Sequence, residues 1–163
     1  MAKPVVKAGI PGPDAPKSVL FVCGMNSIRS PMAAAMTRAL FPFIVYARSA
    51  GVKKGERDHF VDVVMEELDV DISTHNPHTF DELDDENFDL IIALTEEANS
   101  HVQGRLDADA SVKEFWLTED PTEETGTREQ RLEAYRAVRD KLLGQIKERL
   151  GWQPGDGNAR SSF

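Results

Sequence analysis

The sequence contains one cysteine, Cys23, with Arg29 six positions further on and Ser30 directly after it. A loop of five residues between a thiol and an arginine can turn its backbone N–H groups inward, and a helix that starts behind the loop adds the positive end of its dipole. Such a loop would hold an oxyanion, since the planar arginine fork can contact two phosphate oxygens at once. The predicted loop residues are Gly24, Met25, Asn26, Ser27 and Ile28.

The same positive field favours ionisation of the sulfur. A free thiol titrates near about 8.5, whereas a thiol at a helix N-terminus beside an arginine can titrate at roughly 3.5–7.5. The pattern therefore predicts that Cys23 is a nucleophilic thiolate, to which the Ser30 hydroxyl can donate a hydrogen bond. Without this loop, a lone cysteine is more typical of a small buried apolar side chain.

A thiolate nucleophile also needs an acid to protonate the leaving oxygen and then a base to activate water. Asp120, which Pro121 follows, lies directly after the last predicted strand. Since the carboxyl ends of parallel strands meet at one edge of a sheet, Asp120 is expected to meet Cys23 there. An Asp-Pro pair alone is more typical of a turn, so this assignment depends on the cysteine loop.

The elements that position these residues alternate between strand and helix. Short β-branched and aromatic runs predict strands at 18–23, 43–49, 88–94 and 112–117. Helices are predicted at 31–41, 58–70 and 128–150, with another helix capped by Thr95 and a short one in a capping box of Thr79 and Glu82. This alternation predicts a three-layer α/β/α sandwich with a four-stranded parallel sheet.

Helical spacing also predicts which side chains the helices bury. In the helix at 58–70 these are Phe60, Val63, Val64 and Leu68, and in the helix at 128–150 they are Leu132, Tyr135, Val138, Leu142 and Ile146.

The 163 residues are expected to form one domain over 17–150. Prolines and glycines in 1–16 predict a flexible N-terminal arm without regular structure, and 151–163 is expected to be a loose C-terminal tail.

Composition excludes several classes of partner. A formal net charge of −9 disfavours nucleic acid, which needs a basic surface. No window is long and apolar enough to predict a membrane span, and the first residues contain no continuous signal-peptide core. A cytoplasmic protein without an internal disulfide is therefore expected.

Further motifs accompany the cysteine loop in a fixed order: Ser49-Ala50-Gly51, "DISTH" at 71–75, "FDLIIAL" at 88–94, and Asp120-Pro121 before a long C-terminal helix. Together they resemble the low-molecular-weight protein tyrosine phosphatase family, which shares its fold with the thioredoxin-coupled arsenate reductases. The resemblance covers about residues 17–150. It implies hydrolysis of phosphate monoesters, most simply protein phosphotyrosine or a small phosphomonoester, through a phosphocysteine and without a metal or other cofactor. A phosphate or sulfate ion is expected to fit the site.

The resemblance also implies a role for each matching residue. It assigns the nucleophile to Cys23, the phosphate clamp to Arg29, the hydrogen bond to the thiolate to Ser30 and the acid/base to Asp120, with Asn26, Ser49 and His75 bracing the loop.

The chain departs from the family pattern within the loop. The glycine that usually lies two positions after the cysteine lies one position earlier, at Gly24. Met25 is therefore expected either to distort a backbone conformation that favours glycine or to adopt it at an energetic cost. Ile28 replaces a second cysteine, so Cys23 has no partner for an internal disulfide.

The predicted substrate slot departs from the family as well. Thr122 and Glu123 replace two tyrosines of eukaryote-like members, and the loop after Gly51 has no aromatic residue. Phosphotyrosine recognition thus loses its usual stacking walls. Basic residues of that loop either attract an acidic substrate or form a solvated surface; they are Lys53, Lys54 and Arg57.

Two alternatives to a phosphatase stay open. An arsenate reductase would have to use an external thiol, since the chain offers no second cysteine. A regulator could instead hold a phosphoryl group in the loop without turning it over, which the altered loop and substrate walls would suit.

Overall fold

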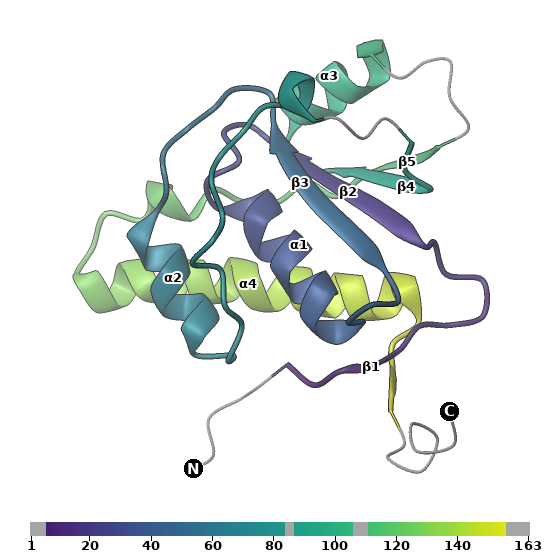
Figure 1. Ribbon diagram of the computed structural model, residues 1–163. Coiled ribbons are helices and arrows are strands. Elements are labelled where there is room, and N and C mark those ends of the chain that lie inside the picture. Colours follow the sequence, from purple (N-terminus) through teal and green to yellow (C-terminus); the bar gives the residue numbers. More distant parts are fainter. Residues whose placement is uncertain (1–5, 84–86, 106–110, 156–163) are drawn as a thin grey trace.

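The computed structural model describes residues 6–83, 87–105 and 111–155. Its main sheet has four parallel strands in the order β3-β2-β4-β5 (Figure 1). They are β2 (Ser18–Cys23), β3 (Tyr46–Gly51), β4 (Leu90–Ala93) and β5 (Val112–Phe115). Because β2 pairs with both β3 and β4, the chain leaves the middle of the sheet at Cys23.

Helices cover both faces of the sheet (Figure 1). Val19 and Phe21 of β2 join the larger core under α1 (Arg29–Leu40), α2 (His59–Glu66) and α4 (Arg128–Leu150). The alternate residues Leu20 and Val22 join a smaller core with α3 (Glu96–Arg105). Period-2 alternation along a strand produces this division. The predicted three-layer α/β/α sandwich with a four-stranded parallel sheet is confirmed.

Most predicted helices are confirmed, and α2 is shorter than expected. α4 has the predicted bounds and buries its whole predicted stripe. The Thr79 capping box precedes η1 (Phe80–Glu82), and Thr95 accepts the Ala98 N–H at 3.0 Å. α2 ends at Glu66 because the chain turns through Asp69, whose φ is 59°. No helix in the described ranges combines the length and apolar character needed to cross a bilayer.

The prediction of a strand at 43–49 is wrong at its start. The apolar residues Phe43 and Ile44 belong to a turn closed by hydrogen bonds to the Phe41 carbonyl, and Phe43 has a φ of 66°. β3 begins at Tyr46 and continues to Gly51, which pairs with Cys23. A run of apolar residues indicates a strand because strand side chains are usually buried in the core. Phe43 is fully exposed, so its apolar character was misleading.

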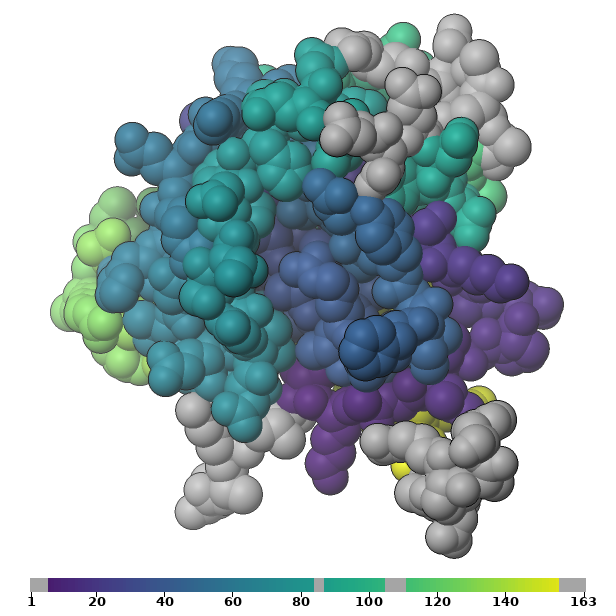
Figure 2. Space-filling view, viewed as in Figure 1, coloured from purple at the N-terminus to yellow at the C-terminus, as the bar shows by residue number. Residues whose placement is uncertain are grey.

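The predictions of an irregular arm and a loose tail are wrong for part of each segment. β1 (Gly9–Ile10) pairs antiparallel with β6 (Gln153–Pro154), and Gly12 donates to the Leu150 carbonyl at 2.8 Å. A Cβ on Gly9 would lie 2.2 Å from the Gln153 carbonyl oxygen, so glycine permits this approach. Figure 2 shows the purple N-terminal and yellow C-terminal residues against each other at the lower edge. Residues 1–5 and 156–163 lie outside the described ranges.

Candidate active site

A cavity of about 330 Å³ lies at the carboxyl end of β2. Six predicted site residues line it: Cys23, Met25, Ser27, Ile28, Arg29 and Asp120. The expected meeting of Cys23 and Asp120 thus occurs. The predicted residues Gly24, Asn26, Ser30, Ser49 and His75 are outside the cavity lining, and most of them hold the loop from behind.

The loop turns successive carbonyl groups outward. Those of Cys23, Gly24 and Met25 accept hydrogen bonds from backbone N–H groups of the segment 52–55. A trans peptide points its C=O and N–H in opposite directions, so the N–H groups of residues 24–26 point away from that segment, to the inner side of the loop. Consecutive inward N–H groups form an anion-binding concavity.

Two glycines allow the segment 51–55 to lie this close to the loop. A Cβ on Gly51 would lie 2.8 Å from the Asn26 nitrogen, and one on Gly55 would lie 2.5 Å from Ser27 Oγ. Any side chain at either position would therefore push the loop out of its place.

Asn26 holds the loop in shape from its buried side. Its Nδ2 donates to Ser30 Oγ at 2.9 Å and to Ser49 Oγ at 3.0 Å, and its Oδ1 accepts the backbone N–H of His78 at 3.0 Å. Asn26 is fully buried and has a φ of 58°. Asparagine tolerates this left-handed conformation better than most residues.

Replacing Asn26 with alanine is expected to lower the free energy of unfolding by about 4–5 kcal/mol. Three side-chain hydrogen bonds are lost at about 1 kcal/mol each, and alanine adds a penalty of about 1–2 kcal/mol at positive φ. Urea unfolding of the variant measures the loss. Asn99→Ala, on α3, is the matched control and should change stability little; an equal loss in both variants would refute the role of Asn26.

The expected distortion at Met25 is wrong. The left-handed residue in the loop is Asn26, whereas Met25 is absent from the positive-φ residues of the described chain. The Met25 side chain points outward and is 48% exposed. The loop therefore accommodates methionine without backbone strain.

His75 contacts the loop through its ring. His75 Nε2 lies 2.8 Å from the Asn26 carbonyl oxygen. Burial lowers the pKa of His75, and the nearby positive charges of His78, Arg57 and Arg38 lower it further. The hydrogen bond to the Asn26 carbonyl raises the pKa, but the lowering effects are larger in sum. The ring is therefore neutral at pH 7, and Nε2 carries the proton because a carbonyl can only accept.

The sulfur of Cys23 lies 2.9 Å from the Ser30 oxygen. Ser30 Oγ already accepts a hydrogen bond from Asn26 Nδ2, so its own hydroxyl hydrogen can be donated either to this sulfur or to the Ala50 carbonyl at 3.4 Å. If Cys23 is ionised, it can only accept, so Ser30 must be the donor. Cys23 is 2% exposed, yet it lines the cavity, so a substrate can reach it.

Arg29 opens α1 beside the sulfur. Its Nη1 donates to the Thr118 carbonyl at 3.0 Å, which holds the guanidinium on the side from which Asp120 comes. The N-cap residue Ile28 makes no side-chain capping bond, and the first turn of α1 carries no acidic residue. No side chain of the first turn therefore neutralises the positive N-terminal end of α1, which is available to stabilise an anion in the loop.

Asp120 opens the short helix η2 (Pro121–Glu123). Its Oδ1 accepts from the Thr122 backbone N–H at 2.9 Å and from the Thr122 hydroxyl at 2.6 Å. Burial raises the pKa of Asp120, but these hydrogen bonds and the charge of Arg29 together lower it below its ordinary value. The carboxylate is therefore ionised when the cavity contains no anion.

Replacing Thr122 with valine is expected to raise the pKa of Asp120. The variant removes the hydroxyl donor to Oδ1, so the charged carboxylate loses part of its stabilisation. The ¹³C resonance of the Asp120 carboxyl, followed against pH, measures the change. Thr125→Val keeps this hydrogen bond and is the control. A midpoint that stays in place or falls in Thr122→Val contradicts the argument.

The sequence did not single out the carboxylates of the wall facing the loop. Glu56 and Asp58 line the cavity together with Arg57 and Thr122, whereas Lys53 and Lys54 do not line it. The Arg57 guanidinium donates to carbonyls of the segment 72–75 and pairs with Asp62, and none of these partners lines the cavity. Of the two readings left open for the basic residues, a solvated surface therefore fits better than a basic substrate wall. The alternation "GERD" was the available signal, but only the turn into α2 reveals which of its residues face the site.

Asp58 links this wall to the helices. Its Oδ1 caps α2 through the Phe60 N–H, and its Oδ2 accepts the Tyr135 hydroxyl at 2.7 Å. Burial and this hydrogen bond raise the pKa of Tyr135, so the phenol stays a donor. The wall is therefore anchored to α4.

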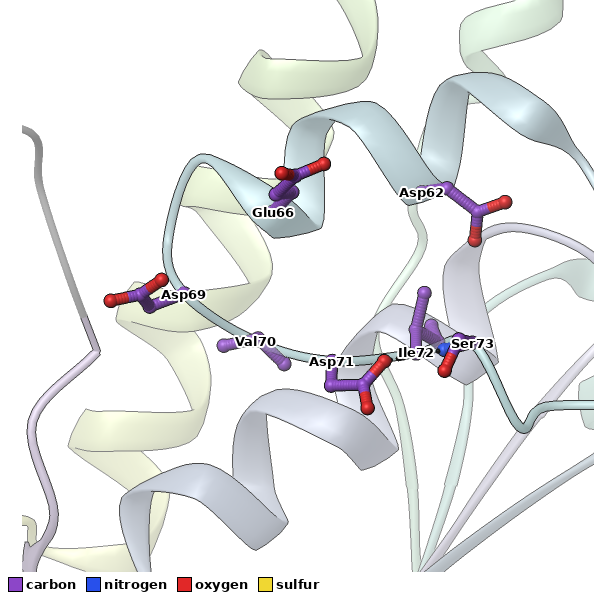
Figure 3. Close-up of a pocket in the computed structure, with 7 residues that line it drawn as sticks. All are labelled: Asp62, Glu66, Asp69, Val70, Asp71, Ile72 and Ser73. Carbon is purple, nitrogen blue, oxygen red and sulfur yellow. Dashed lines mark hydrogen bonds between the residues drawn. The ribbon is translucent and has the colours of Figure 1, made fainter.

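A different hollow, beside α2, has an acidic lining (Figure 3). The carboxylates of Asp62, Glu66, Asp69 and Asp71 point in different directions around it. Asp62 pairs with Arg57, and Asp71 accepts the Ser73 N–H. Across the described ranges, no group of three or more His, Cys, Asp or Glu side chains is placed to hold a metal ion.

Known proteins are similar to this chain in sequence and in fold. A family model described as "Low molecular weight phosphotyrosine protein phosphatase" matches residues 18–149. The glutaredoxin arsenate reductase of Synechocystis sp. is 27% identical over 137 residues, which cover 82% of this chain and 93% of that protein.

Two solved structures are similar over the same region. The arsenate reductase from Archaeoglobus fulgidus is 30% identical with a TM-score of 0.63, covering 82% of this chain and 98% of the other. The low molecular weight protein tyrosine phosphatase from T. tengcongensis is 26% identical with a TM-score of 0.67, covering 80% and 95%. Some of these relatives are named arsenate reductases and one is named a protein tyrosine phosphatase.

Proposed function

The chain belongs to the low molecular weight phosphotyrosine protein phosphatase family, and from this premise we propose that it hydrolyses phosphate monoesters through a phosphocysteine on Cys23. The observation that carries the proposal is that Cys23, Arg29 and Asp120 line one cavity. Nucleophile, anion clamp and proton donor are the three groups that the reaction needs.

In the first step, the Cys23 thiolate attacks phosphorus and the bond from phosphorus to the ester oxygen breaks. Asp120, protonated in the complex with the dianionic substrate, gives its proton to the leaving oxygen. The Arg29 fork and the inward N–H groups of residues 24–26 carry the charge on the remaining phosphate oxygens.

In the second step, water attacks phosphorus while the Asp120 carboxylate accepts its proton. The bond from sulfur to phosphorus breaks, which releases phosphate and restores the Cys23 thiolate. The hydrogen bond from Ser30 stabilises the sulfur as a leaving group.

Protein phosphotyrosine is the first substrate that we propose. None of the described residues that line the cavity is aromatic, so stacking against a ring is replaced by contact with Met25 at the rim. A thioether packs favourably against an aromatic edge. The reduced thiol that this chemistry needs fits a cytoplasmic location.

Replacing Asp120 with asparagine is expected to slow hydrolysis by about 10²–10⁴-fold for phenyl phosphate, whose leaving group needs a proton, and by less for p-nitrophenyl phosphate. The rate constants of both substrates, measured on both proteins, give this ratio. Glu119→Gln alters the exposed neighbour of Asp120 and should leave both rates unchanged. Equal slowing of the two substrates by Asp120→Asn would remove Asp120 from the acid role.

Arsenate reduction is the second candidate, favoured by curated relatives named arsenate reductase. Arsenate would condense with Cys23 with loss of water, and an external thiol would then attack the sulfur. Release of arsenite leaves Cys23 in a mixed disulfide, which a second external thiol reduces. The two thiols supply the two electrons, since this chain has no second cysteine.

One panel of assays separates the candidates. Phosphotyrosine and phosphoserine peptides, p-nitrophenyl phosphate, and arsenate with glutathione or mycothiol are offered to the same preparation. Our proposal predicts phosphate release from the aryl esters at a higher kcat/KM than arsenate-dependent thiol oxidation. The reverse order would identify a reductase, and tight phosphate binding without either turnover would identify a regulator.

A further inference from the structure

A separate cavity of about 310 Å³ has Arg48 and Ser49 of β3 in its lining. β3 is an edge strand of the four-stranded sheet (Figure 1). Its lining is rich in cationic and hydrogen-bond donor groups: Arg38, Arg48, Thr74, His75, Asn76 and His78. Asp71 is the one carboxylate among the described lining residues, and it accepts the Ser73 N–H. Among the described lining residues, Arg38 and Arg48 are the arginines that could contact an anion.

The positive groups of this cavity act on one another. Arg38 reaches it from α1 and donates Nη1 to the Ala47 carbonyl at 2.9 Å. Burial lowers the pKa of Arg38, and the charge of Arg48 lowers it further. Arg48 in turn donates to the Tyr46 hydroxyl. An oxyanion within reach of both guanidinium groups would make charge-assisted hydrogen bonds with them.

His78 supplies an independent observation at the same cavity. Its Nδ1 lies 2.9 Å from the Asn76 carbonyl, which can only accept, so Nε2 is the accepting nitrogen of the neutral tautomer. This Nε2 is buried and has no hydrogen-bond partner among the described residues. A buried acceptor without a partner costs stability unless a donor, such as water or the hydroxyl of hydrogen phosphate, meets it.

We propose that this cavity is an accessory site for a small tetrahedral oxyanion, such as inorganic phosphate, distinct from the cavity of Cys23. Arg38 and Arg48 provide charge-assisted hydrogen bonds, and Thr74 and Asn76 provide neutral donors at the exposed rim. The site does not require the chain to be a phosphatase, so it stands or falls separately from the proposed function.

The accessory site is connected to the loop through shared residues. His75 contacts the Asn26 carbonyl, Ser49 accepts from the Asn26 side chain, and the His78 backbone donates to it. All three residues line the accessory cavity. An anion that orders them also holds Asn26, and with it the loop, in the conformation described above.

The test is a phosphate titration of the ¹⁵N-labelled full chain after Cys23 has been carboxymethylated, which fills the active-site loop with a carboxylate. The amides of Thr74 and Asn76 are expected to shift and saturate. Arg48→Gln should weaken this binding at least tenfold, and Thr74→Val should weaken it too. Lys17→Gln removes the same charge outside the cavity lining and should leave the affinity unchanged.

Unchanged amides at 74–76 in the carboxymethylated chain would overturn the proposal, as would equal affinities of Arg48→Gln and the parent. In the unmodified chain, Arg48→Gln should keep the kcat for p-nitrophenyl phosphate. A chain that hydrolyses no ester but still shows the shifts would contradict only the proposed function.

Discussion

Replacing Cys23 with serine is expected to abolish hydrolysis of p-nitrophenyl phosphate, with a loss of more than about 10⁴-fold in kcat. A serine hydroxyl in the same loop stays protonated at neutral pH, so it cannot attack phosphorus as the thiolate does. The hydrogen bonds of Asn26 and the Arg29 contact with Thr118 do not involve the sulfur, so the loop should keep its shape. Initial rates at substrate saturation measure the loss.

The matched control for this variant is binding. Cys23→Ser should bind inorganic phosphate in the active-site cavity with an affinity close to that of the parent, as followed by the amides of residues 24–27. Loss of both turnover and phosphate binding would indicate a damaged loop instead. Retained turnover would defeat the mechanism, because no other thiol exists in the chain.

Replacing Arg29 with lysine is expected to lower kcat/KM for aryl phosphates by about 10²–10³-fold, the effect of removing one preorganised donor to a developing charge. Lysine keeps the positive charge, but its single ammonium group cannot contact two phosphate oxygens in one plane. It also cannot donate to the Thr118 carbonyl and to the phosphate at the same time in the way that the arginine fork can. Steady-state kinetics with p-nitrophenyl phosphate measure the loss.

The control for Arg29→Lys is Arg128→Lys, which makes the same change at the start of α4, where the arginine lies over the Phe60 ring. It should leave kcat/KM unchanged. If Arg29→Lys kept kcat/KM within threefold of the parent, a positive charge alone would be sufficient for catalysis. The argument that the planar guanidinium must contact two phosphate oxygens would then be wrong.

The sequence predicted the parts of this fold that depend on local pattern. β2 and α4 have the bounds read from their hydrophobic periodicity, and the carboxyl ends of the strands meet as parallel topology requires. The cavity formed by Cys23, Arg29 and Asp120 follows from that topology.

What the sequence could not show depends on contacts between distant segments. Phe43 has the apolar character of a strand residue but lies exposed in a turn. β1 and β6 pair although they lie at opposite ends of the chain, which no local pattern signals. The left-handed residue of the loop is Asn26, because its buried hydrogen bonds select that conformation.

The same limit applies to the wall of the site. Lys53, Lys54 and Arg57 are alike in sequence, but the structure leaves the two lysines exposed and engages the Arg57 guanidinium with carbonyls of the segment 72–75 and with Asp62. The pairing of Asp58 with Tyr135 joins residues far apart in the chain, so periodicity alone could not identify it.

The most direct test of the mechanism is rapid acid quenching during turnover of p-nitrophenyl phosphate, followed by mass measurement of the peptide that contains Cys23. The account predicts a phosphoryl group on Cys23 that appears with the first nitrophenolate and disappears when substrate is exhausted. Continued hydrolysis with Cys23 unmodified at every quench time would contradict it.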